Sequence, residues 1–573
     1  MASIKVGVGH STLPDSRQAG QQAAEEALRS SGHPILTFLF TTDPYNQWAV
    51  WEAVKAVVGP SRLVGFCAGG VIKGNLVSRR AVGVLTLGGK GLRVATSLQR
   101  GLREDPYAAG CAAGEELLLS GIEKGTVFVF TGGSGADVSE AVRGLYNTMG
   151  ADFIYVGGRT KDKAYQFTEA ALEIDALVVA LLDGMAIGTA IGHGWRPKDE
   201  PLVVTNARGE KVLELDGRAA FETYSSRLGG IPEGRFAEWR MRCPLGFPDI
   251  WGNYLIREPL NLSPDGSIEF IADVPKEAVG YIMSCDEREL IKTAANVAEE
   301  AARTIEPKFA LIFDCFSRYL LLGELFKEEL QAIMTSIRPE ALTLGVLSFG
   351  EVGSRGEVPF LHNEAVAVVV GGDRRTAVKQ IQRWQTDLRT AELSVLYEIS
   401  SINFDGSRAT LNEFLHEAMK RAVRLFAIPR CSLLLGPEGD RKILSSWGFK
   451  HAGEIKERIE RKAPNRIQLP LGKKGELGLL FIEKDSQIEE RERRLYRLFA
   501  QQLERALTKV KEIEEHERLL KEIKEEEAQF RALAEQSLVG VYIIAEGRFL
   551  YVNETLANIF GYHPEEILSL IHI

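Results

Sequence analysis

The sequence of 573 residues has little cysteine, no excess of positive charge and no long apolar run. Its 6 cysteines stand apart without paired spacing, which excludes a disulfide framework or a zinc site built on cysteine pairs. Acidic residues (78) outnumber Lys and Arg (69), so the net charge of -9 argues against nucleic acid as a main partner. These absences fit a protein of the cytoplasm, and we expect that location.

Two segments bear on export and membrane insertion. The stretch IDALVVALLDGMAIGTAIGHGW contains Asp175, Asp183 and several glycines, so it predicts a buried strand and turn rather than a membrane span. The N-terminal MASIKVGVGH lacks the charged-then-apolar order of a signal peptide. We therefore expect no membrane partner.

Short apolar runs alternate with helical stretches over the first 375 residues. The runs are rich in β-branched or aromatic residues, and several end in Gly-Gly, which is typical of a buried strand followed by a turn. Helical patterns such as SRQAGQQAAEEALRS lie between them. The alternation predicts a multidomain α/β and α+β chain that begins with a large mixed-sheet body. The expected strands are IKVGVG, ILTFLF, RLVGFCAGG, VGVLTLGG, TVFVFTGG and ALVVALLDG.

The pattern changes after about residue 375. Residues 376–390 predict a charged linker helix, and 391–508 predict a smaller α+β domain. A helix then runs through ERALTKVKEIEEHERLLKEIKEEEAQF, with apolar residues at heptad-like spacing. We expect a signalling coiled coil over 509–528 and a parallel homodimer through 489–530; a solvated linker helix is the alternative, because Glu517 interrupts the seam. The seam residues are Leu503, Ala506, Val510, Ile513 and Leu520.

Two long stretches resemble the FIST sensory family. GHGWRPKDEPLVVTNARGEKVLELDGRAAFETYSSRLG is similar to the family's Gly-His-Gly-Trp turn, Val-Thr strand and Leu-Asp-Gly run. ALIFDCFSRYLLLGELFKEEL and LTLGVLSFGEVGSRGEVPFLHNEAVAVVV resemble its Cys-x-x-Arg helix start, Phe-Gly-Glu turn and His-Asn strand. The resemblance implies a FIST N-terminal module over 1–225, a C-terminal module over 226–375, and sensing of a small molecule. The family usually carries Thr or Ser after His-Asn, whereas this chain has Glu364.

Two further modules follow by resemblance. Residues 391–508 resemble a GAF domain through the long lead helix, the PLG strand and the closing helix. Cys431 is followed by Ser432 rather than histidine, which argues against a bilin chromophore. Residues 529–567 resemble the start of a PAS domain, above all in GRFLYVNETLANIFGYHPEEI.

The C-terminal residues depart from the PAS pattern. About 40 residues of that module are present, whereas a domain of roughly 100 is needed to close its core. Residues 568–573, LSLIHI, also match a reading frame of a transposon adapter used in sequencing libraries, so we expect a non-native tail. A genuine short isoform is the alternative. The resemblance implies a fragment of a longer sensor whose downstream output is a histidine kinase, as in two-component systems, or a diguanylate cyclase.

Polar residues at strand ends of the FIST region form a candidate ligand site. Ligands of open α/β sheets bind outside the carboxyl ends of strands. Arg318 follows the strand FALIFDC and can grip a carboxylate through two bonds, while Glu351 can accept from an ammonium group. We therefore expect an amino acid or another small carboxylate; the alternative is that Arg318 and Glu351 pair with each other. The candidate ligand-binding residues are Cys315, Arg318, Glu351, His362, Asn363, His193 and Trp195.

The same residues leave two other functions open. Cys315, His362 and Glu351 have the residue types of a nucleophile, its base and an orienting acid, so an enzyme is one alternative. No oxyanion motif accompanies Cys315, which favours packing over catalysis. No catalytic domain is recognised in the chain, and whether it is an enzyme stays open. A protein-interaction scaffold without a ligand is the other alternative.

The loop in TGGSGADVSEAV resembles a phosphate-binding loop because it joins a strand to a helix. It lacks both a Gly-Lys-Ser/Thr ending and the third glycine of a dinucleotide loop. Asp137 is better interpreted as the N-cap or a first-turn acid of the helix. We expect no cofactor and no metal.

Overall fold

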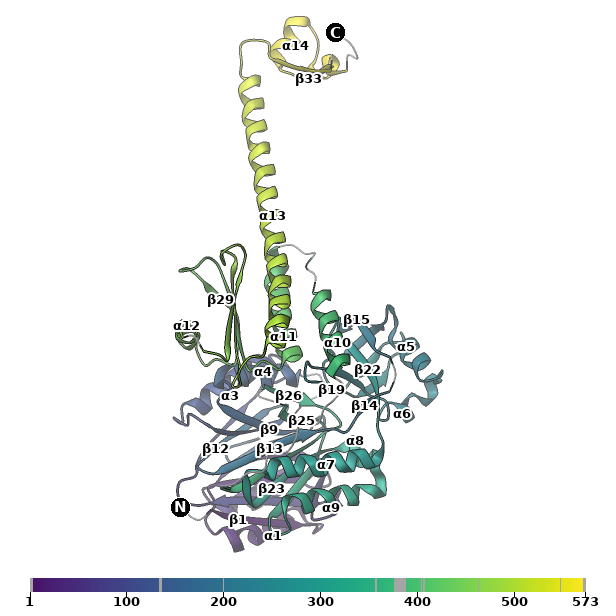
Figure 1. Cartoon of the computed structure of the whole chain (residues 1–573), viewed down its shortest axis with the longest axis vertical. Coiled ribbons are helices and arrows are strands. Elements are labelled where there is room, and N and C mark those ends of the chain that lie inside the picture. Colours follow the sequence, from purple (N-terminus) through teal and green to yellow (C-terminus); the bar gives the residue numbers. More distant parts are fainter. Residues whose placement is uncertain are drawn as a thin grey trace. The chain divides into compact units, whose positions relative to one another are not determined.

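The computed structural model describes residues 4–132, 137–198, 200–355, 358–375, 388–402, 404, 408–461, 463–546 and 548–569 (Figure 1). The chain divides into two compact units, Met1–Asn403 with Asn412–Gln502, and Phe404–Leu411 with Leu503–Ile573. Three predicted features lie partly outside the described residues: the phosphate-like loop at 133–136, the linker helix at 376–387 and the tail at 570–573. None of the helices in the described ranges has both the length and the apolar character that a bilayer crossing needs.

One succession of strand, helix, strand, helix, strand, hairpin and strand occurs three times in the first unit. The first repeat comprises β1 (Lys5–Ser11), α1 (Ser16–Ser31), β2 (Leu36–Thr42), α2 (Gln47–Val58), β3 (Arg62–Ala68), β4 (Gly70–Lys73), β5 (Leu76–Ser78) and β6 (Val82–Gly88). The second comprises β7 (Arg93–Gln99), α3 (Pro106–Leu118), β8 (Gly125–Thr131), α4 (Val138–Met149), β9 (Phe153–Arg159), β10 (Tyr165–Thr168), β11 (Leu172–Ile174) and β12 (Leu177–Asp183). The third comprises β13 (Ala186–Gly192), α7 (Glu287–Ala302), β23 (Ile305–Cys315), α8 (Phe316–Leu322), α9 (Phe326–Ile337), β24 (Leu342–Ser348), β25 (Glu351–Arg355), β26 (Val358–His362) and β27 (Val366–Arg374).

The three repeats build three sheets of one plan. The strand orders are β1-β6-β2-β3-β10-β11, β7-β12-β8-β9-β25-β26 and β13-β27-β23-β24-β4-β5. In each sheet the third and fourth strands are parallel, and the second is antiparallel to both of its neighbours. The mixed-sheet α/β body predicted from the sequence is therefore confirmed.

The hairpin of each repeat is exchanged into the sheet of another repeat. The first repeat's β4–β5 pairs with β24, the second repeat's β10–β11 with β3, and the third repeat's β25–β26 with β9. The exchange passes through all three repeats and closes on itself. Each sheet thus contains strands from two repeats, and the repeats are interlocked.

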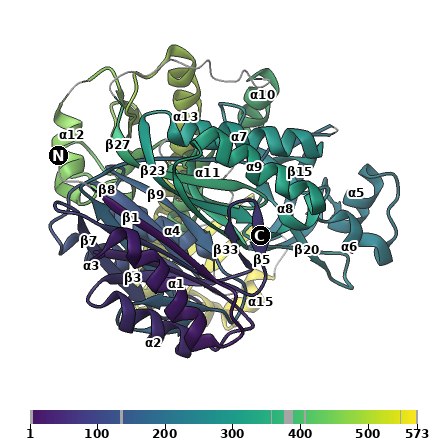
Figure 2. The ribbon, with the colours of Figure 1, turned by 90° about the horizontal axis from the view of Figure 1, so that it is seen from below.

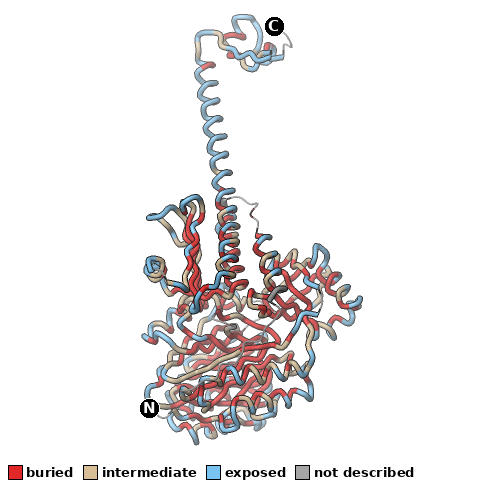
Figure 3. Tube along the Cα trace, in the orientation of Figure 1, coloured by how far each residue is buried: buried red, intermediate tan, exposed pale blue. Residues whose placement is uncertain are grey.

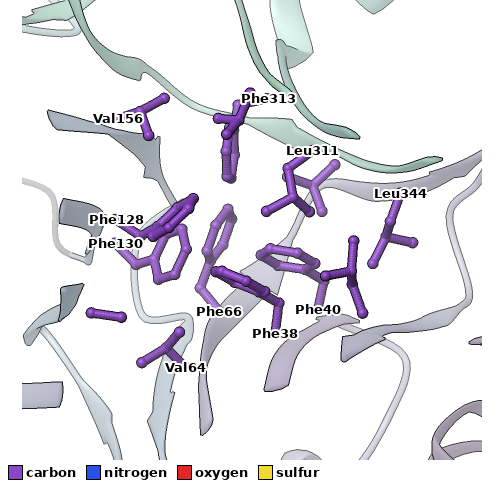
Figure 4. Packing of buried hydrophobic residues seen from close by; sticks show 14 of the residues in the cluster. Phe38, Phe40, Val64, Phe66, Phe128, Phe130, Val156, Leu311, Phe313 and Leu344 are labelled. Atoms are coloured by element: carbon purple, nitrogen blue, oxygen red, sulfur yellow. The ribbon is translucent and has the colours of Figure 1, made fainter. Parts of the chain in front are cut away.

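Equivalent strands of the three repeats meet in a central core of phenylalanines (Figure 4). Phe38 and Phe40 come from β2, Phe128 and Phe130 from β8, and Phe313 from β23; all five are fully buried. Edge-to-face pairs join the repeats, with ring centroids 4.9 Å apart for Phe38–Phe128 and 6.2 Å apart for Phe40–Phe313. The strands of this body are the most continuously buried part of the unit (Figure 3).

Helix pairs cover the outer faces of the sheets. The pairs α1–α2, α3–α4 and α7–α9 pack against one another, and Figure 2 shows α1 and α2 on a different outer face from α7 and α9. Helix α1 lies so close to β1 that a Cβ on Gly7 would stand 1.7 Å from the carbonyl oxygen of Ala27. A Cβ on Gly9 would similarly meet Ala23 at 1.8 Å, so the glycines in IKVGVG are required by helix–strand contact.

A fourth sheet is inserted into the third repeat between β13 and α7. Its nine described strands surround their own core, which includes Val204, Phe221, Tyr224 and Phe247. The insertion comprises β14 (Arg196–Pro197), β15 (Leu202–Arg208), β16 (Lys211–Leu215), β17 (Arg218–Ala219), α5 (Ala220–Arg227), α6 (Phe236–Trp239), β18 (Leu245–Pro248), β19 (Tyr254–Arg257), β20 (Pro259–Leu262), β21 (Ile268–Phe270) and β22 (Val279–Ser284).

Helices and a small antiparallel sheet follow the interlocked body. The sheet order is β29-β28-β31-β30. The α+β character expected for 391–508 is present, and the GAF resemblance stays a prediction. The elements are α10 (Leu388–Ser401), α11 (Arg408–Phe426), β28 (Arg430–Leu435), β29 (Lys442–Trp447), α12 (Ala452–Glu460), β30 (Arg466–Leu471) and β31 (Gly478–Glu483).

The second unit contains most of the long helix α13 (Glu490–Glu535) and a small C-terminal module. That module has β32 (Tyr542–Ala545), β33 (Arg548–Val552), α14 (Glu554–Phe560) and α15 (Pro564–Leu568). The Asn553 carboxamide caps α14 by accepting from the Leu556 N–H at 2.9 Å. Val552, Leu556, Ala557 and Ile567 form its core.

Other local predictions also hold. The apolar segment with Asp175 and Asp183 forms β12, a turn and β13. The 6 cysteines are free. Asp137 is the N-cap of α4, where its carboxylate accepts from the Glu140 N–H at 3.2 Å. Local residue patterns thus define these elements without long-range information.

Candidate functional site

Four predicted residues and Glu364 meet at one corner of the body, where β23 and β26 end and β25 begins. The Cys315 N–H donates to the carbonyl of Ala365 at 3.1 Å, and the Ala365 N–H donates to the Glu351 carboxylate at 3.2 Å. Glu351 and His362 face each other across β25 and β26. All five side chains are almost completely buried. The corner cluster consists of Cys315, Glu351, His362, Asn363 and Glu364.

Arg318 lies beside this cluster in the first turn of α8 and is fully buried. Its guanidinium donates to the Glu329 carboxylate through Nη2 at 2.7 Å and through Nε at 3.3 Å. It also donates to the carbonyls of His193 at 2.7 Å and Leu290 at 3.3 Å, and Asp314 lies 3.3 Å from Nε. Its ion-pair partners are therefore Glu329 and Asp314, and the alternative of an Arg318–Glu351 pair is wrong.

These contacts define a positioning role for Arg318, because they tie α8 to α9, to α7 and to the turn after β13. A ligand carboxylate would reach the guanidinium only by displacing Glu329 or a backbone carbonyl. Direct carboxylate binding by Arg318 stays a prediction.

The turn after β13 contains the two other predicted residues, His193 and Trp195. His193 Nδ1 accepts from the Trp195 N–H at 2.9 Å, so Nε2 carries the proton and donates to the Tyr254 carbonyl at 3.1 Å. Trp195 packs among Tyr254 and Tyr281 of the inserted sheet. The turn thus joins Arg318 to the inserted sheet, and the structure brings all seven predicted residues into one region.

Buried carboxyl groups dominate the electrostatics of this corner. Burial raises the pKa of Glu351 to about 8, against a smaller lowering by hydrogen bonds from Ser348 and Ala365. Burial also raises the pKa of Glu258 to about 7. The pKa of Glu364 lies well above its usual value because of burial and the neighbouring Glu258. Near neutral pH the corner therefore favours protonated carboxyls unless a cation is present.

The raised pKa of Glu351 predicts a pH-dependent stability. The folded protein retains a proton that the unfolded chain releases above about pH 4.5, so the free energy of unfolding falls as pH rises toward about 8. Glu351→Gln removes this titrating group. The free energy of unfolding should then fall less steeply with pH, by about 1.4 kcal/mol per pH unit between pH 5 and 8. Urea unfolding at several pH values measures the slope. Glu52→Gln, at an exposed site, is the control, and equal slopes in wild type and Glu351→Gln would contradict the assignment.

The Cys315 thiol is a poor candidate nucleophile. It is 2% exposed, and burial together with Glu351, Glu258 and Glu364 raises its pKa well above the usual value. A thiolate is the reactive form of cysteine, and these surroundings oppose it.

Cys315 should consequently react slowly with iodoacetamide in the folded full-length protein. We expect alkylation at pH 7.5 at least about 100-fold slower than at the half-buried Cys111, because both access and ionisation are restricted. Peptide mass spectrometry over time measures both sites in one sample. Rapid alkylation of Cys315 that is lost in His362→Ala would instead support the enzyme alternative.

Sequence reasoning missed several residues of this region, among them Asp314, Glu329, Glu258 and Ser348. Two of them did carry a signal. Asp314 interrupts the apolar strand LIFDC, and Glu329 falls on the face of α9 that also carries Phe326 and Leu330. A charged residue at a core position indicates a buried partner.

Metal binding finds no support in this region or elsewhere in the described ranges, where His, Cys, Asp and Glu form no group that could hold an ion. Residues 133–136 of the phosphate-like loop lie outside the described residues, so the exclusion of nucleotide binding stays a prediction.

Comparison with known proteins identifies the modules. Residues 35–218 match the FIST N domain, 220–354 the FIST C domain and 528–572 a PAS domain. Relatives include the uncharacterized protein MJ1623 of Methanocaldococcus jannaschii, 24% identical over 270 residues (45% of this chain, 50% of the relative). Another is the uncharacterized protein Rv0628c of Mycobacterium tuberculosis, 28% identical over 230 residues (38% and 57%). The chain spans about half the length of these curated relatives.

Among solved structures, PurLQS from Thermotoga maritima aligns over 85% of this chain and 88% of that chain, with 9% identity and a TM-score of 0.20. A similarity this low supports no comparison of fold or function.

Proposed function

We propose that this chain, a FIST-domain protein that also carries a PAS domain, is a cytosolic sensor that binds a small metabolite in its FIST body. FIST and PAS domains make it a sensory signal-transduction protein. The ligand is a small polar molecule such as an amino acid, and the signal passes through the GAF-like and PAS modules to a histidine kinase or diguanylate cyclase.

The observation that carries this proposal is the corner cluster. Asn363 and Glu364 are each 1% exposed, and none of their side-chain oxygen or nitrogen atoms has a hydrogen-bond partner among the described residues. Buried polar groups are normally paired, because leaving one unpaired costs roughly 1–3 kcal/mol. A bound polar ligand would supply the partners.

A chain of contacts supports signal transfer out of the FIST body. His193 bonds to the carbonyl of Tyr254, whose ring packs on Tyr281 at 5.9 Å between centroids. The Tyr281 hydroxyl lies 2.9 Å from the Ser394 hydroxyl on α10. The Val279 N–H donates to Glu398 on α10 at 2.9 Å, and Glu398 also pairs with Arg424 on α11. A displacement of the corner cluster on ligand binding would therefore be transmitted to α10 and α11, which lead to the GAF-like module.

The proposal includes a parallel homodimer through α13. Of the predicted seam, Leu503, Ala506 and Val510 are buried within the chain itself, whereas Leu520 is exposed. Ile523 and Phe530 are exposed on the same helix, at spacings of three and seven after Leu520 that fit a heptad seam. Ile513→Asp should shift the full chain from dimer to monomer, because an unpaired charge in the seam costs several kcal/mol. Light scattering at tens of micromolar measures the mass, with Glu515→Asp as control. A wild-type monomer would refute the dimer.

Thermal-shift screening of the full chain tests the proposed function. Amino acids, small amines and organic acids are added in turn, and a ligand at about 100 times its Kd should stabilise the protein by roughly 2.7 kcal/mol. A ligand recovered unchanged supports a sensor, whereas turnover would favour the enzyme alternative. Stabilisation by no compound of these classes would refute ligand sensing and favour a scaffold.

A further inference from the structure

The three repeats allow the corner to be compared with an equivalent position in the same chain. Ala176 and Ala365 directly precede the last strands of the second and third repeats, β12 and β27. Each alanine N–H donates to a side chain, Gln166 at 2.9 Å and Glu351 at 3.2 Å. An acidic residue with left-handed backbone precedes each alanine: Asp175 with φ 56 and Glu364 with φ 50. Asp175 and Glu364 are therefore structural equivalents.

The two equivalent acids differ in their counter-ions. The Asp175 carboxylate lies 3.1 Å from Arg103, and its side chain is 27% exposed. Glu364 is 1% exposed, and the described residues supply neither a hydrogen bond nor an ion pair to it. The third repeat thus keeps the acid but lacks the cation that neutralises it in the second.

The nearby arginines pair with other acids. Arg318 is paired with Glu329 and Asp314, and Arg240 lies 3.6 Å from Oε1 of Glu258. The described acidic, histidine and cysteine residues form no group that could hold a metal ion.

Most of the unpaired atoms around Glu364 are acceptors that suit an ammonium group. They are the two carboxylate oxygens of Glu364, the amide oxygen of Asn363 and one carboxylate oxygen of Glu258, all buried, and the amide nitrogen of Asn363 is an unpaired donor beside them. Glu258 follows Arg257, whose guanidinium donates to the Leu361 carbonyl at 3.0 Å, and its charge raises the pKa of Glu364. An ammonium group carries three donors and one positive charge, which matches this set.

We propose that the corner cluster is the receptor for a small organic ammonium group, with Glu364 as its counter-ion and Asn363 and Glu258 as further acceptors. This inference rests on the proposed sensing function and names the ligand class of that site. The FIST body recognises its ligand by the amine end, while Arg318 positions the surrounding elements.

The protonation of Glu364 gives a second quantity to measure, the number of protons released on binding. Burial and Glu258 hold the pKa of Glu364 well above its usual value, with Glu351 acting in the same direction and Arg318 and Arg240 in the opposite one. The raised pKa favours the protonated acid, whereas an ammonium group favours the carboxylate, so binding should be coupled to proton release.

Calorimetry on the full chain tests the inference with methylammonium, glycine and acetate as probes at pH 7. Wild type should bind methylammonium and glycine but not acetate, and titrations in two amine-free buffers of different ionisation enthalpy should reveal release of up to one proton.

Glu364→Gln should weaken binding of both amines at least about 100-fold, since a charge-assisted contact is lost. Asp175→Asn, at the equivalent position, should bind like wild type. Asn363→Ala removes an unbonded amide and should weaken binding about tenfold without impairing folding.

The outcomes separate this inference from the proposed function. Amine binding that is unchanged in both Glu364→Gln and Asn363→Ala, or binding of acetate alone, would overturn the ammonium receptor while leaving a sensor of another ligand. Absence of binding by every compound in the broader screen would overturn both.

Discussion

Replacing Arg318 with methionine is expected to lower the free energy of unfolding by about 3–5 kcal/mol. Arg318 is fully buried between Glu329 and Asp314, which are fully buried as well. Removing the guanidinium leaves their shared negative charge without a counter-ion, and it frees the carbonyls of His193 and Leu290. Urea unfolding followed by tryptophan fluorescence measures the loss.

The matched control for Arg318 is Arg17→Met. Arg17 pairs with Glu52 at 3.1 Å, but both side chains are more than half exposed, so this substitution should cost less than about 1 kcal/mol. If both substitutions lower the free energy of unfolding equally, burial does not determine how much the Arg318 ion pairs contribute to stability.

Phe130→Ala is expected to cost about 3–5 kcal/mol, the usual loss for a large aromatic side chain removed from a packed core. Its ring, on β8 of the second repeat, lies 5.4 to 6.4 Å between centroids from four other phenylalanine rings, which come from the first and third repeats. The partners are Phe38, Phe40, Phe66 and Phe313. Because the repeats share this core, we expect them to unfold in one transition at a lower urea concentration.

Leu119→Ala provides the control for the core substitution, since this leucine is 88% exposed. It should change the free energy of unfolding by less than about 0.5 kcal/mol. A Phe130→Ala protein in which one repeat unfolds separately from the other two would contradict the shared core.

Local elements of the fold could be predicted because their signals are local. The run TVFVFTGG ends in glycines and forms β8, and Asp137 precedes an amphipathic stretch and caps α4. The convergence of Cys315, Glu351 and His362 could also be predicted, since all three follow or end strands that meet at one edge.

Long-range partners could not be predicted from the same patterns. Nothing in the neighbourhood of Arg318 shows that Glu329, 11 residues away, rather than Glu351, neutralises it. Asp175 pairs with Arg103, whereas the equivalent Glu364 has no such partner among the described residues. This difference emerges only when equivalent positions of the repeats are compared in the folded structure. The exchange of hairpins leaves no local mark, because each hairpin has the same pattern whichever sheet it joins.

The exchanged hairpins also bear on how this chain is made on the ribosome. Hairpin β4–β5 ends at Ser78, but its partner β24 begins at Leu342 and is synthesised much later. At elongation rates of about 5–20 residues per second the delay is on the order of tens of seconds. During that time the β4 edge lacks its neighbour and is open to pairing with other nascent chains. We therefore expect slow elongation between these strands to favour aggregation, and chaperones that shield strand edges to raise the yield of folded protein.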